Sequence, residues 1–130
     1  MKLNFTLSEL VASTTAKRRS INNTPSIKEA DNMMELIINC LQPIREKLGK
    51  PMVVSSGYRC PELNKLVGGK SNSQHLTGCA CDFTVKGMSV DQVYEFIKNG
   101  GFTYDQLIHE GTWVHISYKK TGNRKQAFKI

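Results

Sequence analysis

Two histidines and one aspartate, spaced so that only tertiary folding can bring them together, constrain this chain most strongly. His75 and Asp82 flank a loop that contains Gly78, and His115 follows in the segment WVHIS. The interval from His75 to Asp82 is too long for one helical turn, so loops and strands must bring the side chains together. Two imidazoles and a carboxylate are ligands that zinc takes, and a catalytic zinc site keeps a fourth position for water. The pattern therefore predicts a zinc site of the kind that hydrolases use.

The residues around His115 predict how a second carboxylate reaches this site. Residues 104–110 and 113–118 indicate a hairpin with a two-residue turn between them. In that register the side chains of Glu110 and His115 project to the same side. His109 faces the opposite way, which favours a packing or surface role. The hairpin is thus expected to bring Glu110 to the metal.

The chain resembles a known group of enzymes, the zinc D-Ala-D-Ala carboxypeptidases and phage endolysins. These are related to lysostaphin-type peptidases and to the hedgehog signalling domain. The likeness extends over nearly the whole chain. It is carried by SSGYRCPELN at 55–64, SQHLTGCACDF at 73–83 and EGTWVHIS at 110–117, with weaker support from FTLSEL, INNTP at 21–25 and LQPIREKLG at 41–49.

The resemblance implies roles for individual residues. His75, Asp82 and His115 would bind Zn²⁺, and Arg59 would contact the carbonyl or carboxylate of the substrate. The implied substrate is the stem peptide of peptidoglycan, cut by metal-activated water at either D-Ala-D-Ala or L-Ala-D-Glu. Some relatives carry the catalytic base three residues before the last zinc histidine, where this chain has Thr112. Others carry it five residues before, and we therefore interpret Glu110 as the base.

Three further residues in the matching motifs are expected to bind substrate together with Arg59. These are Ser73, Gln74 and Trp113.

Other readings of the same residues stay open. Each histidine could be a hydrogen-bonded structural residue, and Arg59 could be a solvated loop arginine. A catalytically inactive, zinc-containing wall-binding module would keep the ligands without turnover. A basic nucleic-acid-associated protein would fit the net charge of +7, which comes from 18 Lys and Arg against 11 Asp and Glu. No helix-turn-helix, zinc-finger or stacking motif accompanies that charge, so we expect no specific nucleic-acid partner.

The four cysteines are expected to be free thiols rather than metal ligands. A closed thiolate shell would leave no open position for water. Strand alternation places Cys79 and Cys81 opposite Asp82, as small buried apolar groups. Cys40 lies on an apolar helix face. A disulfide between Cys60 and either Cys79 or Cys81 stays an alternative.

The length of 130 residues predicts one domain, residues 1–130. No apolar run approaches the roughly 20 residues that span a bilayer. The N-terminus lacks a charged segment followed by an apolar one, so we expect synthesis in the cytoplasm, followed by action on the cell wall if the protein is released or delivered. We expect a monomer.

The order of predicted elements indicates an α+β fold, in which a small antiparallel sheet carries the zinc site and packs against N-terminal helices. Helices are predicted at 7–11, after Ser26, at 61–67 and after Ser89, and strands at 52–55, 80–85 and 126–130. Pro43 should kink or split the long helix after Ser26. The core-facing stripe of that helix is read as Ile27, Ala30, Met34, Ile37, Ile38, Leu41, Ile44 and Leu48.

Overall fold

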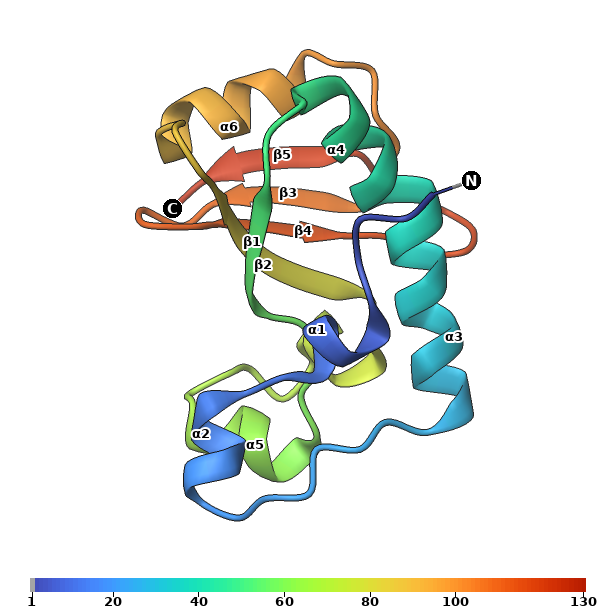
Figure 1. Ribbon diagram of the computed structural model, residues 1–130, viewed down its shortest axis with the longest axis vertical. Helices are drawn as coiled ribbons and strands as arrows, with labels where there is room; N and C mark the ends of the chain where they lie inside the picture. Colours follow the sequence, from blue (N-terminus) through green and yellow to red (C-terminus); the bar gives the residue numbers. More distant parts are fainter. Residues whose placement is uncertain (1) are drawn as a thin grey trace.

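The computed structural model describes residues 2–130, which fold around a five-stranded sheet (Figure 1). The strands lie in the order β1-β2-β4-β3-β5. The α+β class is confirmed, but the sheet differs from expectation at one edge, where β5 runs parallel to β3. The chain leaves β4 and crosses to the far side of β3, so β5 takes the direction of β3. The elements are α1 (Leu7–Val11), α2 (Thr14–Arg18), α3 (Ile27–Leu36), η1 (Ile37–Leu41), α4 (Gln42–Leu48), β1 (Met52–Ser56), α5 (Pro61–Leu66), η2 (Gln74–Thr77), β2 (Ala80–Val85), α6 (Val90–Lys98), β3 (Gln106–His109), β4 (Val114–Ser117) and β5 (Gln126–Lys129).

One long helical segment runs from α3 through η1 to α4. It begins after Ser26, as the sequence predicts, and Ser26 forms a capping box with Glu29. Proline donates no N–H and crowds the preceding turn, so the α-helix is interrupted before Pro43 by the π-helical turn η1. Gly49 ends the segment in the left-handed conformation, with φ at 64°.

The buried face of this segment is rotated from the expected stripe. Ile27 was expected in the core and is 84% exposed, and Ile38 is exposed as well. Met33 and Leu36, which lie outside that stripe, are fully buried. Apolar residues occur on two overlapping faces of the helix, and helical periodicity alone does not say which one the sheet will cover.

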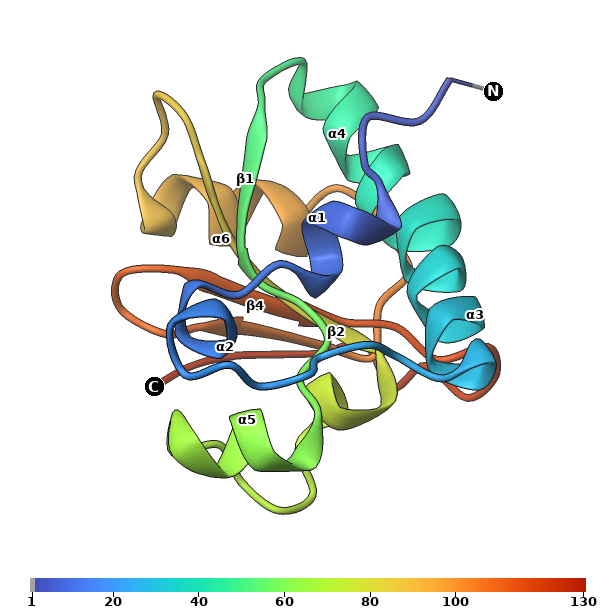
Figure 2. The same cartoon turned by 60° about the horizontal axis from the view of Figure 1, so that its bottom comes forward.

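The two faces of the sheet have different tasks. Cys81, Phe83 and Val85 point from β2 into the hydrophobic core, which α6 and the long helical segment cover. Asp82 lies between them in sequence and therefore points to the other face. Figure 2 shows α6, α3 and α4 on one side of the sheet and α5 on the other. One face is thus used for packing, and the other can carry a site.

The N-terminal region holds one helix that the sequence did not reveal. The helix α1 was expected, but α2 was not, because its residues TTAKR carry no apolar pattern. Ser13 caps α2 by accepting a hydrogen bond from the N–H of Ala16. Among the helices of residues 2–130, none combines the length and the hydropathy needed to cross a bilayer.

Candidate metal centre and catalytic cleft

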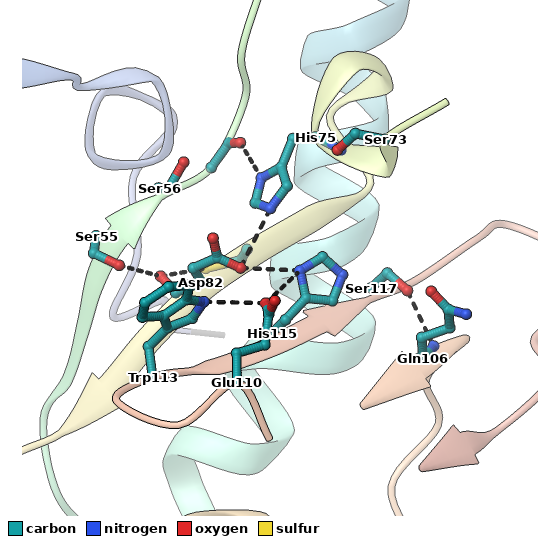
Figure 3. Close-up of polar contacts among 12 residues, drawn as sticks. Ser55, Ser56, Ser73, His75, Asp82, Gln106, Glu110, Trp113, His115 and Ser117 are labelled. Carbon is teal, nitrogen blue, oxygen red and sulfur yellow. Dashed lines mark hydrogen bonds and ion pairs between the residues drawn. The ribbon is translucent and has the colours of Figure 1, made fainter. Parts of the chain in front are cut away.

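Three elements bring the predicted ligands together on the open face of the sheet. His75 comes from η2, and Asp82 on β2 stands directly opposite His115 on β4. Their candidate ligand atoms all lie within 4.8 Å of one another, and the residues are 3%, 5% and 9% exposed respectively (Figure 3). The pairing of β2 with β4 brings Asp82 to His115, and η2 places His75 beside them. The predicted cluster is therefore formed.

The ring of His75 is oriented by the protein backbone. Its Nδ1 lies 2.7 Å from the carbonyl oxygen of Gly57, an acceptor that requires a proton on Nδ1. The lone pair is thereby placed on Nε2, which lies 3.3 Å from Oδ1 of Asp82. A carbonyl partner on the far nitrogen is a common way for proteins to fix the tautomer and orientation of a metal-binding histidine. Nε2 is thus the nitrogen that His75 offers to a metal ion.

His115 faces the cluster with Nδ1, whereas His75 faces it with Nε2. Its Nδ1 lies 2.9 Å from Oδ1 of Asp82, and its ring packs edge-on against that of His75. Burial raises the pKa of Asp82, but its contacts with His115 and His75 outweigh that effect and hold the pKa well below its usual range. Asp82 is therefore ionised at neutral pH. Two imidazole nitrogens and one carboxylate oxygen make a donor set that suits a zinc ion with an open position.

Glu110 reaches the cluster through the predicted hairpin. Strands β3 and β4 pair with Ile108 opposite His115, and the N–H of Glu110 donates to the carbonyl of Trp113 at 3.0 Å. Oε2 of Glu110 lies 3.8 Å from Nδ1 of His115 and accepts a 3.0 Å hydrogen bond from the indole of Trp113. Thr112, the alternative position for the base, is exposed in the turn and is not among the residues that line the cleft.

Arg59 is held beside the ligand carboxylate. Its Nη2 lies 3.3 Å from Oδ2 of Asp82, its Nε donates to Ser56 at 3.0 Å and its Nη1 donates to Asn64 at 3.1 Å. The guanidinium also lines the cleft. Arg59 is therefore more than a solvated loop arginine, because it holds the carboxylate of the candidate ligand Asp82 and lines the cleft.

A cleft of about 610 Å³ opens over the cluster. Ser73 and Gln74, expected to bind substrate, both line it. Ser73 also accepts a hydrogen bond from the N–H of His75 and so caps η2. Trp113 is not part of the lining. It contacts Glu110 instead and so holds the side chain of the candidate base.

Sequence reasoning overlooked a carboxylate next to this cleft. Asp105 is fully buried and accepts hydrogen bonds from Arg124 and Gln74. Hydrogen bonds from Arg124 keep the pKa of Asp105 well below its usual range, against the effect of burial. A lone aspartate before a predicted strand gives no signal of this kind, because its partners are distant in sequence.

The remaining histidine and the cysteines stay outside the cluster. His109 points to the opposite face, where its Nε2 lies 2.8 Å from Asp91 on α6, as its position in the hairpin predicts. All four cysteines are free. Burial raises the pKa of the Cys40 and Cys81 thiols, which are fully buried, whereas Cys79 is only half-buried. The thiols of Cys40 and Cys81 are therefore inert packing groups.

Comparison with known proteins places this geometry in a family. Residues 3–117 match the model of the family described as peptidase M15. The zinc D-Ala-D-Ala carboxypeptidase of Streptomyces albus G is 38% identical over 64 residues. That stretch takes up 48% of this chain and only 25% of the relative, so the relative is much longer than the shared part. The family match covers most of the chain, including all three predicted ligands. The chain belongs to the peptidase M15 family.

Proposed function

We propose that this protein is a zinc-dependent peptidase that hydrolyses a peptide bond in the stem peptide of peptidoglycan. The observation that carries the proposal is the buried cluster of His75, Asp82 and His115, with the Glu110 carboxylate 3.8 Å from one of its ligand atoms. Membership of the M15 family and the name of the Streptomyces relative support both the metal and the substrate class.

The chemistry divides between the metal and the side chains around it. A bound zinc ion would polarise a carbonyl oxygen and lower the pKa of a coordinated water to about 7. Glu110 is placed to accept the proton of the attacking water and to pass it on to the leaving nitrogen. The indole of Trp113 holds one carboxylate oxygen of Glu110 and leaves the other free for this transfer.

Arg59 is the residue we assign to the developing negative charge. Its planar fork suits either the oxyanion that forms on the scissile carbonyl or a terminal carboxylate of the peptide. Ser56 and Asn64 fix the guanidinium from the side, so little reorganisation is needed when charge appears. Because Arg59 suits both an oxyanion and a terminal carboxylate, experiment must decide between an endopeptidase and a carboxypeptidase.

Digestion of a natural substrate tests the proposal directly. Zinc-loaded protein is incubated with purified peptidoglycan, and the released fragments are identified by mass spectrometry. We expect loss of terminal D-Ala or cleavage between L-Ala and D-Glu, and no release with the Glu110→Gln variant. Binding to the wall without any fragments would indicate an inactive binding module. DNA binding that weakens steeply with salt and does not require His75 or His115 would favour a nucleic-acid role instead.

On this proposal the protein acts on the cell wall, as an endolysin would, and works as a monomer. Size-exclusion chromatography with light scattering measures the mass in solution, for which we expect one chain of 14.6 kDa. A stable dimer would overturn the expectation about its assembly and leave the catalytic proposal in place.

A further inference from the structure

Asp105 is a buried carboxylate at the edge of the cleft that pairs with the half-exposed Arg124, and the proposed mechanism does not use it. The residue is 0% exposed and lies immediately before β3. Its Oδ1 accepts from the backbone N–H and Nε of Arg124, both at 3.0 Å. Its Oδ2 accepts from Nη2 of Arg124 at 2.7 Å and from Nε2 of Gln74 at 3.0 Å. A buried carboxylate with this many donors holds its partners in one geometry.

The pair fixes one side of the Arg124 guanidinium and leaves the other side open. Nε and Nη2 face the two oxygens of Asp105, in a bidentate arrangement. Within residues 2–130 no hydrogen bond uses Nη1. The side chain is 47% exposed, and it lines the same cleft as the candidate metal ligands. Arg124 thus presents a pre-oriented N–H group to whatever occupies the cleft.

The position of Arg124 relative to the metal centre follows from strand register. His115 stands opposite Ile108, and Ile108 stands opposite Phe128 on β5. Adjacent strands lie about 4.8 Å apart, so β5 is roughly 10 Å from the strand that carries His115. Arg124 lies just before β5 and shares an Asp105 oxygen with Gln74, the neighbour of His75. An extended peptide covers about 3.5 Å per residue. Arg124 also precedes Phe128 by four residues, so it lies a few residues of extended peptide from the scissile bond rather than next to it.

The charges of the cleft favour an anionic ligand at this position. Its lining includes the cations Arg59, Lys70 and Arg124 and the anions Asp82 and Glu110. Asp82 is already engaged, by Arg59 and the two histidines. Lys70 and the open side of Arg124 remain for the substrate, and planar carboxylates match the arginine fork.

We propose that Arg124 is a specificity-determining residue that binds a carboxylate of the peptide substrate a few residues from the scissile bond, and that Asp105 is its positioning residue. This inference rests on the proposed peptidase function. It adds that the enzyme distinguishes a peptide with a free side carboxylate, such as that of a glutamate, from the same peptide with that group amidated.

Matched substrates test the inference without altering the protein. Two synthetic stem peptides are compared that differ only in a carboxylate or a carboxamide on one residue a few positions from the bond that the enzyme cleaves. We expect kcat/KM for the acid form to exceed that for the amide form by about fivefold, the upper range for a partly exposed ion pair. The difference should lie in KM, because the contact is made equally in the ground and transition states.

Variants assign that preference to Arg124. Arg124→Lys keeps the charge and one contact to Asp105, and it should roughly halve the preference. The double variant Asp105→Asn with Arg124→Gln removes the buried carboxylate together with its cation, so that no unpaired charge stays in the core. It should hydrolyse both peptides equally well. Lys120→Gln is the control for net charge, because Lys120 is exposed and does not line the cleft, and it should keep the full preference.

The outcomes separate this inference from the function on which it rests. If the wild-type protein hydrolyses neither peptide, the proposed function fails. If it hydrolyses both at the same rate, only the inference about Arg124 is overturned. An acid preference that persists in both Arg124 variants, with normal zinc content and melting temperature, would also overturn it and would direct attention to Lys70.

Discussion

The indole Nε1 of Trp113 donates a 3.0 Å hydrogen bond to Oε2 of Glu110, across the turn between β3 and β4. The backbone reinforces the contact, since the N–H of Glu110 donates to the carbonyl of Trp113. A flexible carboxylate near the chain surface is thereby fixed beside His115. A carboxylate held in this way is not a freely solvated acid at a hairpin turn.

Glu110→Gln should abolish most hydrolysis while leaving the site intact. The amide is nearly isosteric and can still accept from Trp113, but it cannot take a proton from water. We expect kcat to fall by about 10²–10⁴-fold, the usual range for loss of a general base. Zinc content and melting temperature should not change. Unchanged turnover would remove Glu110 from the mechanism.

Trp113→Phe is the matched test of how the base is held. The ring is retained and only the N–H donor is lost, so Glu110 keeps its proton-accepting group with less orientation. We expect a smaller fall in kcat, about three- to tenfold, as for loss of one hydrogen bond. A fall as large as that of Glu110→Gln would instead mean that the indole itself contacts the substrate.

Removal of any one of the three candidate ligands should weaken zinc binding by about 100-fold or more, since two protein ligands rarely retain the ion. The variants are His75→Ala, Asp82→Ala and His115→Ala. Zinc affinity measured with a competing chelator gives the answer. His109→Gln is the control, because this histidine lies on the opposite face of the sheet and contacts Asp91. Equal zinc affinity in all four variants would refute the ligand set.

Arg59→Lys separates charge from geometry. The ammonium keeps a positive charge near Asp82 but cannot make the contacts of the guanidinium with Ser56 and Asn64. We expect near-normal zinc content and a fall of about tenfold in kcat/KM. A fall in kcat indicates a contact to the developing oxyanion, and a rise in KM indicates a ground-state carboxylate. Wild-type kinetics would leave Arg59 with its structural contacts alone.

Stability should depend on pH through Asp105. Its pKa is lower in the folded protein than in the unfolded chain, so its ion pair contributes full stability above about pH 4, the unfolded value. That contribution is lost as the pH falls below 4 toward the folded pKa. Melting temperatures between pH 2 and 6 should therefore drop less steeply in Asp105→Asn than in the wild-type protein. The variant should be about 1–3 kcal/mol less stable at neutral pH. Parallel curves would contradict this assignment.

Gly57→Ala should disturb both folding and metal binding. A Cβ at this position would collide with the backbone carbonyl of Leu10, so the chain around Gly57 must shift. The carbonyl of Gly57 is the partner of Nδ1 of His75, and its displacement would release the tautomer and orientation of that ring. We expect a lower melting temperature and about tenfold weaker zinc binding. Gly87→Ala is the comparison, because a Cβ there meets nothing, although its positive φ adds local strain. It should lower the melting temperature and leave zinc affinity unchanged.

The sequence was most informative where a pattern is local. The hairpin register that aligns Glu110 with His115 follows from strand alternation and turn length, and it is confirmed. The capping boxes at Ser26 and Ser89 follow from residues three positions apart. Close spacing in sequence makes such contacts nearly independent of the rest of the fold.

Contacts between distant segments were missed where no motif marks them. Gln74, Asp105 and Arg124 meet only because β5 returns beside β3, and no motif marks that return. The buried face of the long helix was missed for a similar reason, since Met33 is in the core because of where the sheet lies. Side-chain roles that depend on long-range packing need the structure.

The hydrogen bond between His75 and Gly57 links the metal centre to the N-terminus. The next residue, Tyr58, donates its N–H to the carbonyl of Leu10 in α1 at 2.8 Å. Ion binding stabilises only the conformations in which the site is formed, so the opening of these contacts becomes rarer as zinc is added. Amide hydrogen exchange at Tyr58 should therefore slow in proportion to zinc occupancy, whereas Gln126, on the far edge strand β5, should respond less. The first helix, which contributes no ligand, thus becomes a reporter of whether the centre is loaded.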